Sequence, residues 1–398
     1  MITGEKALKI VASETPALKS ERVPLAGAVG RVLAEDIAAD TDMPPFDRSQ
    51  MDGYAVRAAD TENAPVTLTV VGESAAGRGW HKTLGPGEAV RIMTGAPLPA
   101  GADAVQKIEV TSEAGDTVTI KEPTAAGRYI VPQGKEIKKG RTVLKAGTAI
   151  TAANIAVPAA FGYSRLKVAK RPRVAILSTG TEIVDVAKRP KRDQIRNSNS
   201  IMLRALCEAI GACADIIPHV GDDLSELKAR ISDAARGSDV LVTTGGVSVG
   251  KYDLTKLALG ELGAEIFFER LRLKPGKPTV FAVLKKCRVF GLPGNPVSAA
   301  VTFHLFVRPM LLGMQGSGCV SLKTGEAISL GNFKATPERD AYMPGKLGTD
   351  ASGSLTVAPI DFHGSSDFIG FAGADALVRV KRGSRFTAGE VVDVLFLF

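Results

Sequence analysis

The sequence predicts a multidomain α/β plus β protein, built around a doubly wound, mainly parallel α/β domain. Strand-like and helix-like segments alternate over residues 171–314, which is typical of a parallel sheet with right-handed crossovers. Strand-like runs separated by glycine-rich turns predict a β-rich insert over 51–136 and a C-terminal small β-barrel over 315–398. The flanking segments, 1–50 and 137–170, are each too small to fold alone, so we expect one discontinuous, elongated linker domain of helical character.

Composition sets the broad class. The chain has 398 residues with 45% hydrophobic and 23% charged residues, as in ordinary globular proteins. No apolar run approaches the roughly 20 residues of a membrane helix, and the N-terminus is too charged for a signal peptide. The four cysteines show neither CxxC spacing nor a disulfide framework, which favours buried reduced thiols over a zinc site. We therefore expect a cytoplasmic protein that does not associate with membranes.

The first 170 residues contain a helical pattern over 4–12 and a strand-like alternation over 51–56. Asp52 lies at the start of that strand and follows a proline-rich segment, so it belongs to an ordered loop or strand edge. Strands and turns continue over 66–121, with Thr94 on a turn rich in Gly, Ala and Pro. Taken alone, such polar residues cap turns more often than they catalyse reactions.

The α/β elements follow in alternating order. Asn197–Asn199 and either Asp222 or Asp223 are candidate N-caps of two helices. His304 lies in an apolar helical run and is expected to pack in the core. The expected strands are 174–178, 214–220, 239–243 and 264–273, and the expected helices are 200–210 and 224–235, before two strands and a helix that begins near Pro296.

The segment Ser238–Asp253, SDVLVTTGGVSVGKYD, is the strongest candidate for anion binding. It is an apolar strand that leads into a glycine-rich turn and then a helix. Glycine permits close backbone approach, and a helix N-terminus offers free N–H groups and a partial positive charge, which suits a phosphate. An ordinary strand-to-helix turn is the alternative interpretation of this segment alone.

Loops that follow the strands of a parallel sheet converge at one edge, where ligands bind. Glycine loops there offer backbone donors, Lys274 and Lys277 offer ammonium groups, and Glu182, Asp222 and Asp253 offer carboxylates. Carboxylates beside a phosphate repel it unless a divalent cation lies between them, although each acid alone is also compatible with a helix cap. The set predicts a phosphorylated or nucleotide ligand bound with Mg²⁺. The converging loops are 178–182, 244–253, 274–277 and 293–298.

The net charge of +8 is concentrated in the same region. Residues 171–314 contain 21 Lys and Arg against 14 Asp and Glu. This surplus suits a polyanionic ligand. A nucleic-acid partner is not expected, because the sequence has no basic aromatic stripe and no recognisable nucleic-acid module.

The C-terminal segment has two polar features of interest besides its strands. These are Arg339 and the HGSSD stretch at 363–367. A surface loop is the first interpretation of both.

Several motifs occur in an order that resembles the molybdopterin molybdenumtransferase family, which includes the MoeA proteins and the E domain of gephyrin. The motifs are MDGYAVR, RIMTGAPLP, STGTE, IRNSN, TTGGVSVG, KPGKP and LPGNPVSA. The resemblance is strong over about 20–314 and weak in the tail. It implies an α/β domain of the molybdopterin-binding type, a homodimer, and Mg²⁺-dependent insertion of molybdate into adenylyl-molybdopterin to give molybdenum cofactor and AMP. Molybdopterin adenylyltransferase and molybdoenzymes are the further partners it implies.

The resemblance also implies roles for individual residues. Glu182, Asp222 and Asp253 would hold the metal, and Lys274 and Lys277 would bind molybdate. The implied catalytic residues are Asp52, Thr94, Glu182, Asp222, Asp253, Lys274 and Lys277. The implied ligand-binding residues are Ser178, Thr179, Gly180, Gly245, Gly246, Val247, Ser248, Gly250, Pro293, Gly294, Asn295, Arg339 and Ser365.

The chain departs from the family pattern at a few positions. Lys135 replaces an acid, Glu136 replaces an aspartate, and Pro344 stands where a second arginine is common. These departures leave a non-catalytic molybdopterin-binding paralogue, acting as carrier, sensor or scaffold, as the alternative to the enzyme. The carboxylates favour the enzyme, because a pure binding module has little need of them.

Overall fold

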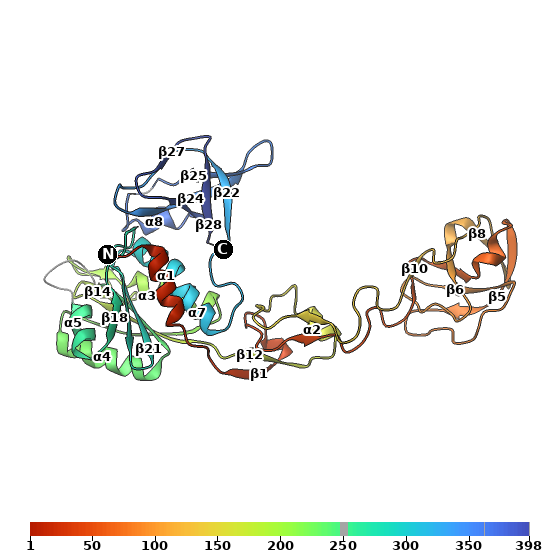
Figure 1. Cartoon of the computed structure of the whole chain (residues 1–398), viewed down its shortest axis with the longest axis horizontal. Coiled ribbons are helices and arrows are strands. Elements are labelled where there is room, and N and C mark those ends of the chain that lie inside the picture. The colour runs from red at the N-terminus through yellow and green to blue at the C-terminus, as the bar shows by residue number, and fades with distance from the viewer. Residues whose placement is uncertain (247–253, 362, 398) are drawn as a thin grey trace. The chain divides into compact units, whose positions relative to one another are not determined.

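The computed structural model of the chain describes residues 1–246, 254–361 and 363–397 (Figure 1). The chain divides into two compact units. Unit 1 comprises Met1–Glu35, Ala146–Ile155 and Arg165–Phe398, and unit 2 comprises Asp36–Lys145 and Ala156–Ser164.

A six-stranded sheet forms the centre of unit 1, and its order is β16-β13-β17-β21-β20-β18. The first four strands are parallel, and β20 is antiparallel to both of its neighbours, so the sheet is mainly parallel as predicted. The strands are β13 (Arg173–Thr179), β16 (Cys213–Val220), β17 (Val240–Thr244), β18 (Glu265–Phe268), β20 (Val280–Leu284) and β21 (Cys287–Leu292).

The two faces of this sheet carry separate hydrophobic cores. Val174 and Ile176 of β13 pack in one core, and Ala175 and Leu177 pack in the other, because successive strand residues point to opposite faces. Helices α1 (Gly4–Ser13), α3 (Ser198–Ala209), α6 (Pro296–Thr302) and α7 (Arg308–Met314) cover the first face, while α4 (Leu224–Gly237) and α5 (Leu254–Glu261) cover the second. Helices on both faces make the sheet doubly wound, as predicted.

The predicted strand over 264–273 is wrong in its extent. Strand β18 ends at Phe268, and Leu273–Lys274 forms a separate strand, β19, which pairs with β24 of the C-terminal sheet. The charged residues Glu269 and Arg270 lie between the two strands and separate their buried apolar side chains. Periodicity alone could not show that the chain changes its pairing partner here.

The helical run Pro296–Met314 corrects the expectation that no apolar segment approaches membrane-helix length. Its 19 residues meet that length and composition, and 83% of the apolar window is buried inside the protein. It is therefore a core helix. His304 lies in its central π-helical turn, η4 (Phe303–Val307), and is buried as predicted.

The expectation that the cysteines are buried is confirmed for two of the four. All four cysteines are free, with Cys207 and Cys287 buried and Cys213 and Cys319 exposed. Cys213 begins the edge strand β16, and Cys319 lies in the turn region that precedes β22. Cys213 pairs with a strand on one side only, which leaves its side chain exposed.

The C-terminal part of unit 1 is a small β-barrel, as predicted. The sheet order is β19-β24-β25-β22-β28-β26, and the additional β24–β26 pairing closes the five longer strands on themselves. Its core is lined by alanine and valine side chains, which suit a narrow interior. The strands are β22 (Thr324–Ser329), β24 (Asp340–Thr349), β25 (Leu355–Pro359), β26 (Ala376–Val380) and β28 (Val391–Phe396), with the pair β23 (Phe333–Lys334) and β27 (Arg385–Phe386) and the short helix α8 (Phe368–Phe371) alongside them in the chain.

Unit 2 contains the predicted β-rich insert as a six-stranded sheet of order β7-β4-β6-β5-β9-β8. The interior strand β4, second from one edge, is buried along its whole length, and the sheet has a hydrophobic cluster on each face. The strands are β4 (Gly53–Val56), β5 (Val66–Ser74), β6 (Glu88–Ile92), β7 (Ala104–Lys107), β8 (Thr111–Ala114) and β9 (Thr117–Ile120).

Short antiparallel strand pairs join the segments before residue 50 to segments after residue 129. The pairs are β1 (Ser20–Pro24) with β12 (Arg165–Ala169), β2 (Ile37–Ala38) with β11 (Thr142–Leu144), and β3 (Arg48–Ser49) with β10 (Ile130–Val131). The predicted helical character of these segments is therefore wrong, because strands are their main elements. Helix α2 (Ala156–Ala160) is short, and helix α1 packs in the core of the α/β sheet. Gly140 and Gly147 have positive φ values, which other residues rarely adopt, so the chain turns on either side of the short strand β11. The division into four domains stays a prediction.

Burial of His304 predicts an acid-sensitive contribution to stability. Burial lowers the pKa of His304 from 6.5 to about 4, so the folded protein holds the neutral ring while the unfolded chain binds a proton more readily. Stability should therefore fall as the pH drops from about 6.5 towards 4, by up to about 3 kcal/mol. His304→Met should lose less stability over this range in urea unfolding. The control His219→Met replaces an exposed histidine and should follow the wild type, and identical acid profiles for all three proteins would contradict the prediction.

Candidate functional site

A cavity of about 1010 Å³ opens at the carboxyl edge of the parallel sheet in unit 1. The loops after β13, β17 and β21 line it, as predicted from the convergence of such loops. The predicted site residues in the lining are Ser178, Thr179, Gly180, Glu182, Asp222, Gly245, Gly246, Pro293, Gly294 and Asn295. The predicted residues Val247, Ser248, Gly250 and Asp253 lie outside the described residues.

Gly245 and Gly246 form a floor of backbone that no larger residue could replace. Their φ values are +91° and +65°. A Cβ atom on Gly245 would lie 2.5 Å from the carbonyl oxygen of Thr179, and one on Gly246 would lie 2.7 Å from Thr255 Oγ1. The absence of side chains therefore lets the turn pack closely against Thr179 and Thr255.

Two buried hydroxyl groups adjoin this floor. Thr179 Oγ1 and Thr255 Oγ1 have no hydrogen-bond partner among the described residues. A Cβ on Gly246 would lie within 2.8 Å of both hydroxyls, so both adjoin the glycine turn. Unsatisfied buried hydroxyls are destabilising unless a ligand or water completes them. Of the two residues only Thr179 lines the cavity, so its hydroxyl is the candidate polar binding position.

Two asparagines tie the loops together. Asn197 donates from Nδ2 to Ser178 Oγ (2.8 Å) and caps α3 through the N–H of Ser200 (3.2 Å). Asn199 donates from Nδ2 to Thr244 Oγ1 (2.9 Å) and to the carbonyl oxygen of Gly294 (2.7 Å). The IRNSN motif was the available signal, but cap propensity alone does not reveal these distant partners.

Glu182 and Asp222 bring two carboxylates to the cavity. Asp223, rather than Asp222, caps α4, since its Oδ1 accepts a hydrogen bond from the N–H of Glu226 (2.8 Å). Asp222 instead accepts one from Thr181 Oγ1 (3.2 Å) and remains directed to the site. Within the described ranges, no group of three or more His, Cys, Asp or Glu could hold a metal ion. Because Asp253 lies outside those ranges, the predicted metal set stays a prediction.

Lys274 and Lys277 are not part of the cavity lining in the described structure. Lys274 ends β19 and is exposed, whereas Pro278 contributes to the cavity wall. The carbonyl oxygen of Lys277 accepts hydrogen bonds from the N–H groups of Leu271 (2.9 Å) and Thr279 (3.1 Å), which hold this loop in place. The lysines therefore flank the wall rather than form it.

The C-terminal segment contributes to the cavity through the HGSSD stretch and not through Arg339. Ser365 Oγ accepts a hydrogen bond from Asn295 Nδ2 (2.8 Å), and its carbonyl oxygen accepts one from the N–H of Val297 (3.1 Å). Ser366 and Phe368 line the cavity beside this contact. Arg339 lies in a turn with Thr336 and is absent from the lining. The HGSSD stretch is a surface loop, with His363 and Ser366 exposed, and through Ser365 it also packs on the LPGNP segment.

Asp52 and Thr94 form a polar pair in unit 2. Asp52 Oδ1 accepts hydrogen bonds from the N–H (2.7 Å) and Oγ1 (2.9 Å) of Thr94. The backbone hydrogen bond, followed by the hydroxyl bond, lowers the pKa of Asp52, so this carboxylate is ionised at neutral pH.

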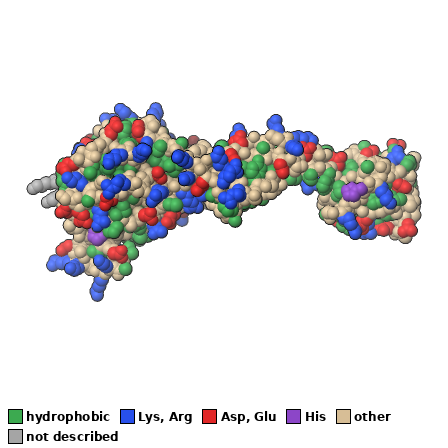
Figure 2. Space-filling model, turned by 90° about the horizontal axis from the view of Figure 1, so that it is seen from below, with side chains coloured by type: hydrophobic (Ala, Val, Ile, Leu, Met, Phe, Trp, Pro, Cys, Tyr) green, Lys and Arg blue, Asp and Glu red, His purple; other side chains and the backbone are tan. Residues whose placement is uncertain are grey.

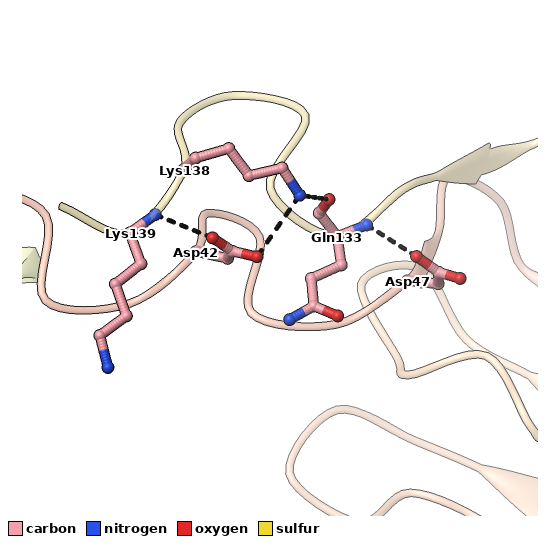
Figure 3. A network of polar contacts seen from close by, with 5 residues as sticks. All are labelled: Asp42, Asp47, Gln133, Lys138 and Lys139. Carbon is pink, nitrogen blue, oxygen red and sulfur yellow. Dashed lines mark hydrogen bonds and ion pairs between the residues drawn. The ribbon is translucent and has the colours of Figure 1, made fainter. Parts of the chain in front are cut away.

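Side-chain carboxylates also join the segments that flank the insert in unit 2 (Figure 3). Asp47 Oδ1 accepts a hydrogen bond from the N–H of Gln133 (2.7 Å), and Asp42 Oδ1 accepts one from the N–H of Lys139 (2.8 Å). Lys138 Nζ lies 3.5 Å from Asp42 Oδ2 and donates to the carbonyl oxygen of Gln133 (3.0 Å). The altered segment that holds Lys135 and Glu136 is thus well anchored.

Glu136 retains an ionic role despite its departure from the family pattern. Its Oε1 lies 2.8 Å from Arg48 Nη2, at a partly exposed position. A longer carboxylate side chain therefore still pairs within unit 2, while the neighbouring Lys135 is exposed.

A basic segment, defined here as Lys188–Arg196, forms another part of the cavity wall. Pro190, Gln194, Ile195 and Arg196 of this segment line the cavity. Arg196 donates from Nε to the carbonyl oxygen of Lys188 (3.1 Å), which closes the segment on itself. On the face of the molecule seen in Figure 2, basic and acidic side chains are otherwise intermingled.

This combination defines a class of protein in which a doubly wound α/β domain with a glycine-floored cavity is joined to a β-rich insert and a small barrel. Three family models match successive parts of the chain. They are the MoeA N-terminal region (domain I and II) at residues 2–162, a probable molybdopterin binding domain at 175–313, and the MoeA C-terminal region (domain IV) at 326–397.

Full-length relatives identify the family. The chain is 36% identical over 399 aligned residues to a molybdopterin molybdenumtransferase of Staphylococcus aureus (strain COL), with 99% of this chain and 95% of the relative covered. A molybdopterin molybdenumtransferase of Staphylococcus epidermidis is 33% identical with the same coverage. The chain belongs to the molybdopterin molybdenumtransferase (MoeA) family.

Solved structures agree with this assignment. The molybdopterin biosynthesis MoeA protein from Pyrococcus horikoshii OT3 matches with a TM-score of 0.86 and 30% identity, and all of both chains is covered. A second structure of a Pyrococcus MoeA protein matches with a TM-score of 0.82 and 35% identity, covering 100% of this chain and 99% of that one.

Gly246→Ala tests the glycine floor. The added Cβ would displace Thr179 or Thr255 and strain a backbone at φ +65°, so AMP binding measured by calorimetry should weaken at least about tenfold. Gly260→Ala is the matched control, because that glycine lies in α5 with no atom within 4 Å of the new Cβ. Equal AMP affinity in the two variants would exclude the floor from the binding site.

Proposed function

We propose that the protein is a molybdopterin molybdenumtransferase, which inserts molybdate into adenylyl-molybdopterin to give molybdenum cofactor and AMP. The observation that carries this proposal is the cavity in which a glycine floor, two carboxylates and a basic segment meet. The match of relatives along 99% of the chain supports the same activity.

The chain's own residues provide two kinds of contact for a phosphorylated ligand. The floor at Gly245 and Gly246 brings backbone to the cavity wall, and the hydroxyl of Thr179, which has no partner among the described residues, can donate to phosphate oxygens. Such preorganised donors position the ligand for reaction.

Glu182 and Asp222 fit a divalent cation, and we propose Mg²⁺. Both are hard oxygen donors on the wall of the same cavity, and without a cation they would repel a phosphorylated ligand. Asp253 would be the third ligand. When bound, Mg²⁺ would neutralise and polarise the phosphoanhydride of the adenylyl group.

Lys274 and Lys277 are the proposed molybdate-binding residues. Both precede Pro278, which is part of the cavity wall, and Lys277 is its direct neighbour in the chain. An ammonium group is a compact donor that suits a tetrahedral oxyanion. The sulfur ligands of the metal come from the dithiolene of the substrate, so the reaction requires no cysteine of the protein.

Assembly and partners are part of the same proposal. We propose a cytoplasmic homodimer in which the β-rich part of one chain meets the α/β domain of its mate. Asp52 and Thr94 would act there on the partner's ligand. Molybdopterin adenylyltransferase would supply the substrate, and molybdoenzymes would receive the product.

The basic segment is suited to attract this polyanionic substrate. Lys188, Arg189, Lys191 and Arg192 are exposed, and none of the ion pairs between described residues involves their side chains. Their positive charges are therefore available to attract an anionic ligand to the cavity, whose lining includes the carboxylates of Glu182 and Asp222.

Single-turnover conversion tests the activity directly. Protein loaded with adenylyl-molybdopterin should release AMP and form molybdenum cofactor in equal amounts when magnesium and molybdate are added. Omitting magnesium should stop both products. A bound ligand that yields neither product under full conditions would identify the chain as the non-catalytic molybdopterin-binding paralogue.

Lys274→Ala tests the molybdate site. Loss of one charge-assisted contact should raise the molybdate concentration at half-maximal rate roughly tenfold. Lys323→Ala removes another exposed lysine, next to β22 and outside the cavity lining, and should leave this concentration unchanged. An unaltered molybdate dependence in Lys274→Ala would remove this lysine from the oxyanion site.

Replacing Lys188, Arg189, Lys191 and Arg192 with glutamine tests the basic segment. Affinity for adenylyl-molybdopterin should fall roughly tenfold at low ionic strength and converge with that of the wild type at high salt, because salt screens exposed charges. The control replaces Lys381, Arg382 and Arg385, which are exposed but absent from the cavity lining. Equal losses in both variants would show a general charge effect rather than a role of this segment.

A further inference from the structure

We propose that Phe368 is a stacking platform for a flat, fused-ring heterocycle of the ligand and so determines which ligands the cavity prefers. This inference rests on the proposed function, because adenylyl-molybdopterin carries two such rings, a pterin and a purine. It assigns a role to a C-terminal residue that the sequence motifs leave without one.

Phe368 is an exposed aromatic residue on the wall of a polar cavity. It begins the short helix α8, which Figure 1 labels. Its side chain lines the cavity and is 51% exposed. Among the described lining residues it is the only aromatic one. Covering an exposed aromatic face with the flat ring of a ligand removes apolar surface from water and so stabilises the complex.

Two aliphatic side chains extend this apolar surface. Val186 and Ile195 also line the cavity and are 46% and 58% exposed. With Phe368 they form what we call the apolar rim. The cavity lining therefore combines a polar floor of glycines with exposed apolar side chains.

Hydrogen bonds hold Phe368 in a defined place relative to the floor. Asp367 caps α8 by accepting from the N–H of Gly370 (2.9 Å), and it also accepts from the N–H of His363 (3.0 Å). The preceding Ser365 is hydrogen-bonded to Asn295. Asn295 follows Gly294, and a Cβ built on Gly294 would lie 3.5 Å from Gly245 Cα. A short chain of contacts thus connects the rim to the glycine turn.

A ligand that satisfies both parts must carry an anionic group and a flat apolar face. A phosphate on the floor and a fused heterocycle on the rim meet this requirement, whereas a sugar phosphate satisfies the floor alone. Stacking of a nucleobase on an aromatic side chain contributes roughly 10- to 100-fold in affinity.

Affinity measurements with paired ligands test the platform. Phe368→Ala should weaken binding of AMP roughly 10- to 100-fold and leave ribose 5-phosphate within about twofold of the wild type. Phe368→Tyr should restore AMP binding. Molybdopterin, which lacks the purine, distinguishes the two rings, since only a pterin on the rim would make its affinity depend on Phe368.

Ile369→Ala is the matched control for these measurements. Ile369 is adjacent in α8 and 77% exposed, but it does not line the cavity, so its removal should change no affinity. Equal weakening of AMP and ribose 5-phosphate by Phe368→Ala would overturn the inference, because it would indicate a structural role. Unchanged affinity for AMP and molybdopterin would overturn it as well.

A fluorescent probe gives an independent readout. Trp80 is the only tryptophan of the chain and belongs to unit 2, so the double substitution Trp80→Phe with Phe368→Trp places a single indole at the rim. Its emission should change on addition of AMP or molybdopterin but not of ribose 5-phosphate. An indole that responds to none of the ring-bearing ligands would contradict stacking.

The proposed function and this inference can fail separately. A wild-type protein that binds a ring-bearing ligand through Phe368 but forms no cofactor would overturn the function and keep the platform. Cofactor formation by the wild type, with unchanged ring-ligand affinity in Phe368→Ala, would keep the function and overturn the platform.

Discussion

The close approach of Gly245 to its neighbours is the constraint on which the cavity depends. A Cβ at this position would lie 2.5 Å from the carbonyl oxygen of Thr179, so the turn after β17 can pack against the loop after β13 only because it lacks a side chain. The same closeness lets the loop after β21 approach through Gly294, and it leaves two buried hydroxyls facing the turn. Asn199 then bridges the loops after β17 and β21, so one steric condition supports the shared edge of several loops.

The C-terminal barrel belongs to the site because its connecting segment contacts the α/β domain. The hydrogen bond from Asn295 to Ser365 joins a loop of the sheet to the residues that precede α8. Strand β19 makes a second connection, since it leaves the α/β domain to pair with β24. A molybdopterin-binding α/β domain by itself would therefore lack Phe368, the aromatic residue of the rim. The barrel therefore contributes to the cavity even though the glycine turns that form its floor belong to the α/β domain.

The altered residues of unit 2 preserve its anchoring. Asp42 and Asp47 accept hydrogen bonds from backbone N–H groups on the far side of the insert, and Glu136 forms an ion pair with Arg48. These contacts join chain segments about 90 residues apart, with sequence separations of 86, 97 and 88. The departures at Lys135 and Glu136 thus leave these supports of unit 2 in place.

The sequence by itself determined the order of strands and helices, the doubly wound sheet and the glycine turns of the site, because periodicity and glycine content report on local burial and backbone freedom. Only the tertiary structure decided which side chains reach the cavity. It made Asp223 the cap and Asp222 a wall residue, left Lys274 and Lys277 outside the lining, and brought Phe368 into it. The partners of Asn199 lie 45 and 95 residues away in the chain. Local patterns cannot encode such contacts, because they are fixed only when the elements pack together.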